Sequence, residues 1–290
     1  MIIIADSGST KTTWMEVESG NKVVTEGLNP HFTTDEQFLA ACAAVRENFH
    51  PSTSNFQLFF YGAGCGLAAQ RQRVASLLTK VFGTSDVHVE TDMLGACRAT
   101  AGDRPALVAI LGTGSNACLY DGQGIVHQPT STGYILGDRG SANHVGRLLL
   151  DGYLAHRMPV AVRRMFHDTF KMSDAQLMDA VYHQPHPNRF LASLAPFAVQ
   201  HIEVDYCDEM IVEALAQWYF SVLVYMQRPA AKLRRTKAWD GTLHVVGGFA
   251  KAIEPHLQVL FEDPHPFQLH LASVLADPIE GLREYHIKKI

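Results

Sequence analysis

Two widely separated segments of the chain, residues 2–17 and 106–120, share one unusual pattern. Each has a run of β-branched or aliphatic residues, a turn of Gly, Ser and Thr, and a second strand-like run. Small residues at the tip of a hairpin permit positive φ angles and close approach of the backbone to a ligand. The pattern predicts two related halves, each beginning with such a hairpin, with the two turns opposed across a cleft.

The first turn combines one carboxylate with hydroxyl groups and backbone amides. Asp6 ends the first run, and Gly8, Ser9, Thr10 and Lys11 follow it. The amides can hold the β- and γ-phosphate oxygens of a nucleotide, while Asp6 can hold Mg²⁺ directly or through water. A P-loop is excluded, because Thr10 precedes Lys11 where that motif needs Gly. An ordinary polar turn is the alternative interpretation.

The second turn repeats this chemistry without the carboxylate. Gly112 and Gly114 flank Thr113, and Ser115 and Asn116 follow. Two glycines leave the backbone amides open to an anion. A Gly-x-Gly turn is weak evidence by itself, but its pairing with the first hairpin favours a nucleotide-phosphate site.

Three further loops have the composition of ligand-binding loops. Asp92 begins an expected helix, where a carboxylate also serves as a plain N-cap. Asp138 lies between glycines ahead of an amphipathic helix, and Gly247 and Gly248 join a strand to a helix N-terminus. A flat ring or a phosphate can lie on such a glycine turn. Each loop also has a structural alternative, as a cap or a tight turn.

The order of the expected elements indicates an α/β fold, because strands alternate with helices in the first part of the chain. The first half has expected helices at 35–49, 67–82 and from Asp92, with strands at 57–61 and 87–90. Later come helices at 141–155, 160–170, 173–182, 189–201 and 205–235, a last strand at 243–246 and a helix from Phe249.

Two domains account for this order. We expect residues 1–103 with 277–290 to form the N-terminal domain, because a tail helix at 277–285 can pack back on it. Residues 104–276 then form a second domain with a large helical insertion. The turn at Gly62–Gly66 is too irregular for a dinucleotide-binding motif, because Leu67 stands where its third glycine belongs.

Charge and cysteine usage limit the partners and the compartment. The formal net charge of −5 gives no basic field for a phosphate backbone, so no nucleic-acid partner is expected. The most apolar stretch, 210–226, carries Glu213 and Gln217, so no membrane association is expected either. No signal-peptide pattern precedes the first strand, which indicates a cytoplasmic protein. The cysteines fit reduced core thiols: Cys42, Cys65, Cys97, Cys118 and Cys207.

Taken in order, these loops resemble the N-acetylglucosamine kinase branch of the BadF/BadG/BcrA/BcrD ATPase family, within the superfamily of actin, heat-shock chaperone ATPases and sugar kinases. The matching motifs span nearly the whole chain: 6–10, 27–30, 91–92, 112–116, 137–141 and 247–248. The resemblance implies two ribonuclease H-like, actin-like ATPase domains around a nucleotide cleft. It also implies ATP and Mg²⁺ as cofactors and a small sugar as the substrate.

The resemblance implies a role for each matching residue. Thr10 and its neighbours, together with Thr113 and its two glycines, would bind phosphate, and Gly247 and Gly248 would flank the adenosine. The sugar would contact Asn29, Asp92, Ser115, Asn116, Gly133 and Asp138. Asp92 would be the general base, taking the proton from a hydroxyl, the 6-OH of N-acetylglucosamine, as it attacks the γ-phosphate.

Two departures from the family pattern lie near the expected sugar. Thr132 stands where kinases of the animal type have Trp, and Arg139 stands where the family has Glu. Both concern the choice of sugar rather than phosphoryl transfer.

Two other functions stay open at this stage. One is the ATPase activator of a radical dehydratase, which carries an iron–sulfur cluster and needs closely placed cysteines, whereas Cys65 and Cys97 are isolated in the sequence. The other is a non-catalytic sugar sensor with the same cleft. The oligomeric state is also open, with a homodimer as one option.

Overall fold

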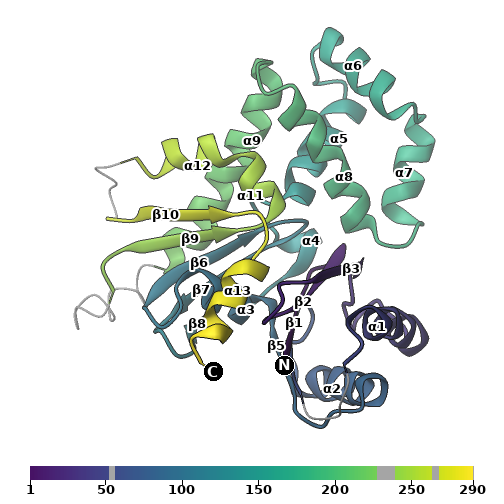
Figure 1. The fold of residues 1–290 in the computed structure, drawn as a ribbon. Coiled ribbons are helices and arrows are strands. Elements are labelled where there is room, and N and C mark those ends of the chain that lie inside the picture. Colours follow the sequence, from purple (N-terminus) through teal and green to yellow (C-terminus); the bar gives the residue numbers. More distant parts are fainter. Residues whose placement is uncertain (52–55, 227–238, 263–267, 290) are drawn as a thin grey trace. The chain divides into compact units, whose positions relative to one another are not determined.

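The computed structural model describes residues 1–51, 56–226, 239–262 and 268–289. The chain divides by its internal contacts into two units (Figure 1). Unit 1 comprises Met1–Val108, Tyr120–Ile125 and Asp277–Ile290, and unit 2 comprises Ala109–Leu119 and Val126–Ala276. Unit 1 contains one five-stranded sheet and unit 2 contains most of the other, each with helices, so the predicted α/β class is confirmed.

The sheet of unit 1 has the order β3-β2-β1-β4-β5. Its strands are β1 (Ile2–Ser7), β2 (Lys11–Glu16), β3 (Lys22–Glu26), β4 (Gln57–Gly62) and β5 (Val87–Thr91). β1, β2 and β3 form an antiparallel meander, whereas β1, β4 and β5 run parallel. Ser7 pairs with Gly62, and Gly62 pairs with Thr91, so the carboxyl ends of three strands meet at one edge of the sheet.

Alternating side chains of this sheet fill two cores. Ile3, Trp14 and Phe60 pack on one face with α1 (Asp35–Phe49) and α2 (Ala68–Phe82). Ile4 and Met15 point to the other face, which is covered by α3 (Asp92–Thr100) and α13 (Ile279–Ile287). The period-2 alternation of β1 therefore anchors the C-terminal helix to the N-terminal strand.

The second sheet has the order β10-β9-β6-β7-β8. Its strands are β6 (Ala106–Leu111), β7 (Ser115–Tyr120), β8 (Ile125–His127), β9 (Thr242–Val246) and β10 (His270–Leu275). The helices of unit 2 are α4 (Gly133–Leu136), α5 (Ala142–Leu154), α6 (Val160–Phe170), α7 (Asp174–Tyr182), α8 (Pro187–Gln200), α9 (Asp205–Trp218), α11 (Gly248–Ala252) and α12 (Glu254–Leu260).

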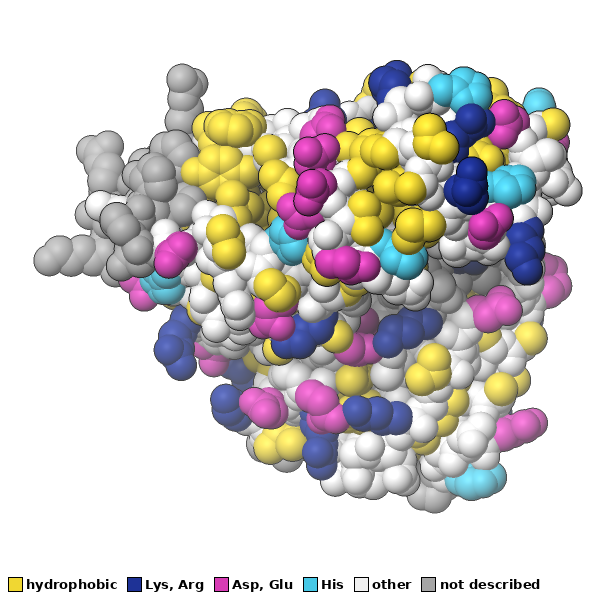
Figure 2. All heavy atoms as spheres, turned by 90° about the horizontal axis from the view of Figure 1, so that it is seen from above, with side chains coloured by type: hydrophobic (Ala, Val, Ile, Leu, Met, Phe, Trp, Pro, Cys, Tyr) yellow, Lys and Arg dark blue, Asp and Glu magenta, His cyan; other side chains and the backbone are white. Residues whose placement is uncertain are grey.

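Within unit 2, α5 and α8 approach closely because Gly146 lies against the backbone of Leu191. Buried aromatic rings such as Phe166 and Phe197, whose centroids are 5.2 Å apart, fill the helical part. On the face seen in Figure 2, acidic, basic and apolar side chains are interspersed. Among the described residues, no helix is both long enough and apolar enough to cross a membrane.

Three strands differ from the sequence prediction. β3, β8 and β10 were not expected, and the strand at 243–246 is therefore not the last. All three lie at the edge of a sheet, where one strand face or both stay exposed and the hydrophobic pattern is weak. The expected helix at 205–235 contains a π-helical turn, Tyr219–Leu223, and its part beyond residue 226 lies outside the described residues.

Candidate functional site

The turn between β1 and β2 is braced by a separate loop. Gly8 donates its amide to the Lys11 carbonyl at 3.0 Å, which closes the turn. The hydroxyls of Ser7 and Thr12 lie 2.8 Å apart, and the Leu28 amide donates to both. A Cβ on Gly27 would come within 2.6 Å of the Gly8 carbonyl oxygen. Only glycine therefore lets this loop lie directly on the turn.

Asp6 and Asp92 are positioned by the same sheet edge. Asp6 is the penultimate residue of β1, and Asp92 starts α3 directly after β5. Burial raises the pKa of Asp6 well above its usual value, and the charges of Asp277 and Asp92 add to this, opposed by Lys11. The structure thus gathers three carboxylates and one ammonium group beside the first turn.

The Asp92 side chain is not the N-cap of α3. Thr91 is the cap, because its hydroxyl accepts a hydrogen bond from the Leu94 amide at 3.2 Å. Asp92 instead accepts from the adjacent Met93 amide at 2.9 Å. Burial raises the pKa of Asp92 to about 6, with the Met93 amide acting in the opposite direction. The plain capping interpretation of Asp92 is therefore wrong.

Asp277 is a residue of this region that the sequence did not reveal. Its Oδ2 accepts from Lys11 Nζ at 2.6 Å and from the Thr13 hydroxyl at 3.2 Å. Its Oδ1 accepts from the Ile279 amide at 3.0 Å, which fixes the start of α13. In the sequence Asp277 was merely the start of a tail helix, and no local pattern connects it with Lys11.

Asn29 directly follows Leu28, whose amide donates to the Ser7 and Thr12 hydroxyls of the first hairpin. Its Oδ1 accepts from the His31 amide at 3.0 Å and packs against Gly64. Its Nδ2 group donates no hydrogen bond to the residues described, so this amide is the polar end that a ligand can use.

The second predicted turn, between β6 and β7, is held by the N-terminus of α5. Gly112 accepts from the Ala142 amide at 2.9 Å, and Thr113 accepts from the Asn143 amide at 3.1 Å. Gly247, with a φ of +136°, packs against Leu111 and Gly112 so closely that a Cβ would collide with the Leu111 carbonyl. Unit 2 therefore brings the turn and the Gly247–Gly248 loop together.

Asp138 supports the same turn from the other side. It adopts a left-handed φ of +51°. Its Oδ1 accepts from the Ser115 amide at 3.2 Å, and its Oδ2 accepts from Asn143 Nδ2 at 2.9 Å. The expected helix cap is also present, because the Ser141 hydroxyl accepts from the His144 amide. Asp138 thus links the loop before α5 to the β6–β7 turn.

A cavity of about 250 Å³ opens beside these residues in unit 2. Its lining includes three of the predicted sugar residues, Ser115, Asn116 and Asp138, and both departures from the family pattern, Thr132 and Arg139. Gly133 begins α4, whose last residue, Leu136, also lines the cavity. The sequence did not single out the other polar lining residues, Thr130, Ser131 and Ser221.

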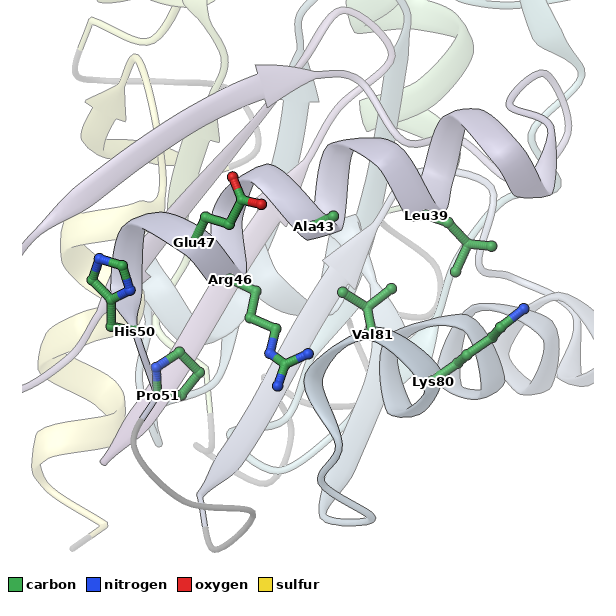
Figure 3. Close-up of a pocket in the computed structure, with 8 residues that line it drawn as sticks. All are labelled: Leu39, Ala43, Arg46, Glu47, His50, Pro51, Lys80 and Val81. Carbon is green, nitrogen blue, oxygen red and sulfur yellow. The ribbon is translucent and has the colours of Figure 1, made fainter.

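A larger hollow of about 670 Å³ lies between α1 and α2 (Figure 3). Arg46, Glu47 and Lys80 line it together with aliphatic side chains. None of the predicted site residues takes part, and the charges are mixed. Its size therefore does not make it the functional site.

Two α/β units, each with a glycine- and hydroxyl-rich hairpin whose turn is held by hydrogen bonds, are features of one class of protein: the actin-like ATPases and sugar kinases. Comparison with solved structures supports this fold. The chain is 14% identical to a MamK mutant bound to AMPPNP, with a TM-score of 0.54. The match covers 100% of this chain and 98% of the MamK chain. A ROK-family glucokinase from Streptomyces griseus, in complex with glucose and AMPPNP, is 15% identical with a TM-score of 0.54, and covers 98% and 97%.

The chain belongs to the BadF/BadG/BcrA/BcrD ATPase family, which it matches over residues 5–260. A protein from Porphyromonas gingivalis, provisionally named an N-acetylglucosamine kinase, is 33% identical, with a TM-score of 0.87 and coverage of 99% of both chains. A similarly named protein from Chromobacterium violaceum is 18% identical, with a TM-score of 0.69 and coverage of 98% of both chains. No curated protein matched the chain.

Proposed function

We propose that this protein transfers the γ-phosphoryl group of ATP to a small sugar. The sugar is N-acetylglucosamine, and the acceptor is its 6-OH group. The proposal rests on Asp92, a buried carboxylate with a pKa of about 6. Asp92 follows β5 at the edge of the sheet where the first hairpin also lies. Such a group is ionised near neutral pH and still basic enough to accept a proton. The provisional name of the Porphyromonas gingivalis relative supports the same sugar.

The nucleotide would be held by backbone amides and small side chains. On this proposal the turn of Gly8, Ser9, Thr10 and Lys11 binds phosphate oxygens, and so does the turn of Gly112, Thr113 and Gly114. Gly247 and Gly248 flank the adenosine. MamK and the glucokinase were solved with AMPPNP, which is consistent with nucleotide binding by this chain.

Asp6 has the properties of a Mg²⁺ ligand. Burial raises the pKa of Asp6, the charges of Asp277 and Asp92 raise it further, and a divalent cation would relieve the repulsion among these carboxylates. Mg²⁺ bound with a nucleotide takes one or two carboxylates, water and phosphate oxygens. When bound, the ion would neutralise charge on the phosphate groups, with Asp6 holding it directly or through water.

The sugar would contact the residues that the family resemblance implies. Asn29 offers its unused Nδ2 amide, and Asp92 offers the carboxylate. Ser115, Asn116, Gly133 and Asp138 complete the proposed contact set. In the reaction Asp92 Oδ accepts the proton of the 6-OH, whose oxygen forms the new bond to the γ-phosphorus as the bond to the β-phosphate oxygen breaks. Positioning and charge stabilisation supply most of the catalysis.

The proposal is tested by ADP release coupled to a reporter enzyme, with N-acetylglucosamine as acceptor. We expect Asp92→Asn to lower kcat by about 10²–10⁴-fold, because general-base help is lost. Asp86→Asn is the matched control: Asp86 is an exposed carboxylate that pairs with His88. An Asp92→Asn enzyme with most of its sugar-dependent ADP production would refute the role of Asp92.

The radical-dehydratase activator receives no support from the thiols. All five cysteines are buried, and burial raises the pKa of Cys65 to about 12. Iron–sulfur ligation requires thiolates, which such burial disfavours. A sugar sensor without catalysis would show no sugar-dependent ADP release in the same assay.

A further inference from the structure

The Asn29 side chain can offer a ligand only one kind of hydrogen bond. Its Oδ1 accepts from the His31 amide at 3.0 Å, and a backbone N–H can donate only to the oxygen of the side-chain amide. This bond fixes which way round the amide lies and leaves Nδ2 as the remaining donor. The side chain is 7% exposed, so the surrounding atoms also restrict its rotation. A ligand atom that contacts Asn29 must therefore be an acceptor, such as a sugar oxygen.

The backbone around Asn29 forms a closed turn at residues 29–33. The Asn29 carbonyl accepts from the Phe32 amide at 3.0 Å and from the Thr33 amide at 2.9 Å. From the other side Gly64, with a φ of +81°, packs so closely that a Cβ there would collide with Asn29 Oδ1. The orientation of the Asn29 amide thus depends on two loops, the turn at 29–33 and the loop at 62–66.

Arg73 of α2 holds the first of these loops. Its Nη1 donates to the Pro30 carbonyl at 2.5 Å, and its Nη2 donates to the Thr33 carbonyl at 2.9 Å. Its Nε donates to Asp35, the first residue of α1, at 2.8 Å. The planar guanidinium group can bond to all three partners at once, which the single ammonium group of lysine would do poorly. One side chain therefore joins the turn that follows Asn29 to both helices.

Arg71 of the same helix holds the second loop. Its Nη1 donates to the Cys65 carbonyl at 2.9 Å and to the Gly66 carbonyl at 2.8 Å. The loop contains the glycine that packs against Asn29. It also lies close to Asp92, because the charge of Asp92 adds to the effect of burial in raising the pKa of the Cys65 thiol. The loop therefore reaches from the proposed sugar-binding amide to the surroundings of the proposed base.

We propose that Arg73 is a positioning residue for the sugar, with Arg71 in a supporting role. Arg73 holds the Asn29 amide in the one orientation in which Nδ2 donates to a sugar oxygen. The inference rests on the proposed function and adds to it two residues that do not touch the substrate. Four hydrogen bonds from the two guanidinium groups to loop carbonyls carry it, since both of these loops set the position of Asn29.

Steady-state kinetics with N-acetylglucosamine test this role. In Arg73→Gln we expect KM for the sugar to rise about 10-fold, because a misplaced binding group weakens the complex. The kcat and the KM for ATP should stay within about 2-fold of wild type. Arg73→Lys keeps a cation beside Asp35 but bonds poorly to both carbonyls, so its KM should be intermediate. Arg71→Gln should act in the same direction as Arg73→Gln.

The control is a second arginine of the same unit. Arg46 is exposed on α1 and lines the hollow between α1 and α2 (Figure 3), so Arg46→Gln should leave all three kinetic constants unchanged. Changes in kcat and in KM for ATP as large as the change in KM for the sugar would show that Arg73 merely supports the fold. That result would overturn the inference.

A double-mutant cycle shows whether Arg73 acts through Asn29. Asn29→Asp keeps the acceptor for the His31 amide but removes the donor, so KM for the sugar should rise while the turn persists. In the Asn29→Asp background Arg73→Gln should add less than about 2-fold, because the donor that it positions is already absent. A further rise of about 10-fold would mean that the two residues act independently, and would overturn the inference.

Hydrogen exchange tests the support of the turn without any sugar. The amides of His31, Phe32 and Thr33 donate within the turn, and Arg73→Gln should speed their exchange by about 10-fold. Exchange at the wild-type rate would show that Arg73 does not hold the turn, and would also overturn the inference.

Binding distinguishes failure of this inference from failure of the proposed function. Calorimetric titration of N-acetylglucosamine, with a non-hydrolysable ATP analogue present, needs no turnover. If the sugar gives no ADP but binds, and Arg73→Gln weakens that binding about 10-fold, the kinase proposal fails and the role of Arg73 stands. If the sugar is phosphorylated and Arg73→Gln binds it as tightly as wild type, the kinase stands and the role of Arg73 fails. Neither turnover nor binding would overturn both.

Discussion

Lys11 Nζ lies 2.6 Å from Asp277 Oδ2, and this ion pair joins the first hairpin to the segment that leads into the C-terminal helix. The Thr13 hydroxyl donates to the same oxygen, and the Ile279 amide donates to the other. One carboxylate therefore fixes the ammonium group of the hairpin and the start of α13 together.

Asp277→Asn should weaken both nucleotide binding and folding. The amide keeps an acceptor for Ile279 but loses the ion pair, so Lys11 is no longer held beside the turn. We expect the free energy of unfolding to fall by about 1–2 kcal/mol and KM for ATP to rise several-fold. Urea unfolding and steady-state kinetics measure these effects.

Glu280→Gln is the control for that variant. Glu280 pairs with Lys22 at 2.6 Å, but both side chains are largely exposed, so its loss should cost less than about 1 kcal/mol. Equal effects of the two variants would show that Asp277 is an ordinary surface partner.

The activity should depend on pH through Asp92. Since the base must be ionised and burial raises the pKa of Asp92 to about 6, kcat/KM for the sugar should be level above that pH. Below it, kcat/KM should fall about tenfold per pH unit as the carboxylate becomes protonated. A profile measured from pH 5 to 8 that stays flat would contradict this prediction.

Gly27→Ala should disturb the first hairpin directly. A Cβ at Gly27 would lie 2.6 Å from backbone atoms of Gly8 and Ser9, so the phosphate-binding turn must shift. We expect a loss of about 1–3 kcal/mol in stability and a higher KM for ATP. Gly66→Ala is the control, because no atom lies within 4 Å of its Cβ position. If the two variants behave alike, close packing at Gly27 is unimportant.

The buried His286 should make the protein sensitive to acid. Burial, with the charges of Arg98 and His88, lowers its pKa from 6.5 to about 4. The unfolded chain therefore binds the proton first, and stability that is complete above pH 6.5 is lost as the pH falls toward 4. Between pH 7 and 5 the loss attributable to His286 should be about 1–2 kcal/mol.

His286→Gln should reduce that slope, as measured by urea unfolding at both pH values. Tyr61 lies within hydrogen-bonding distance of His286, at 2.9 Å, so the variant will also be less stable at pH 7. His183→Gln, at an exposed position, should keep the wild-type slope. An unchanged slope in His286→Gln would contradict the explanation.

Elements with a strong periodic pattern could be predicted from the sequence. The helix at 35–49 has its predicted bounds, because Thr34 and Gln37 form a capping box and Phe38, Cys42 and Val45 share its buried face. The two hairpins were predictable because each combines buried strands with a turn of small residues. Edge strands such as β3 lack that signal, because their faces are partly exposed.

The candidate site was predictable only where a local pattern marks it. Gly112–Asn116 and Asp138 could be singled out from the glycines around them, but the hydrogen bond that joins Ser115 to Asp138 spans 23 residues of sequence. The same limit hid Asp277, whose partner Lys11 is 266 residues away. Contacts between distant segments depend on strand order and register, which no single motif specifies.

Identification of the product tests the central claim most directly. Incubation of the enzyme with ATP, Mg²⁺ and N-acetylglucosamine, followed by ³¹P NMR and mass spectrometry, shows which bond has formed. We predict a sugar phosphate esterified at O6, formed in equal amount to ADP and absent with Asp92→Asn. ADP without any sugar phosphate, or no ADP with this sugar, would contradict the account.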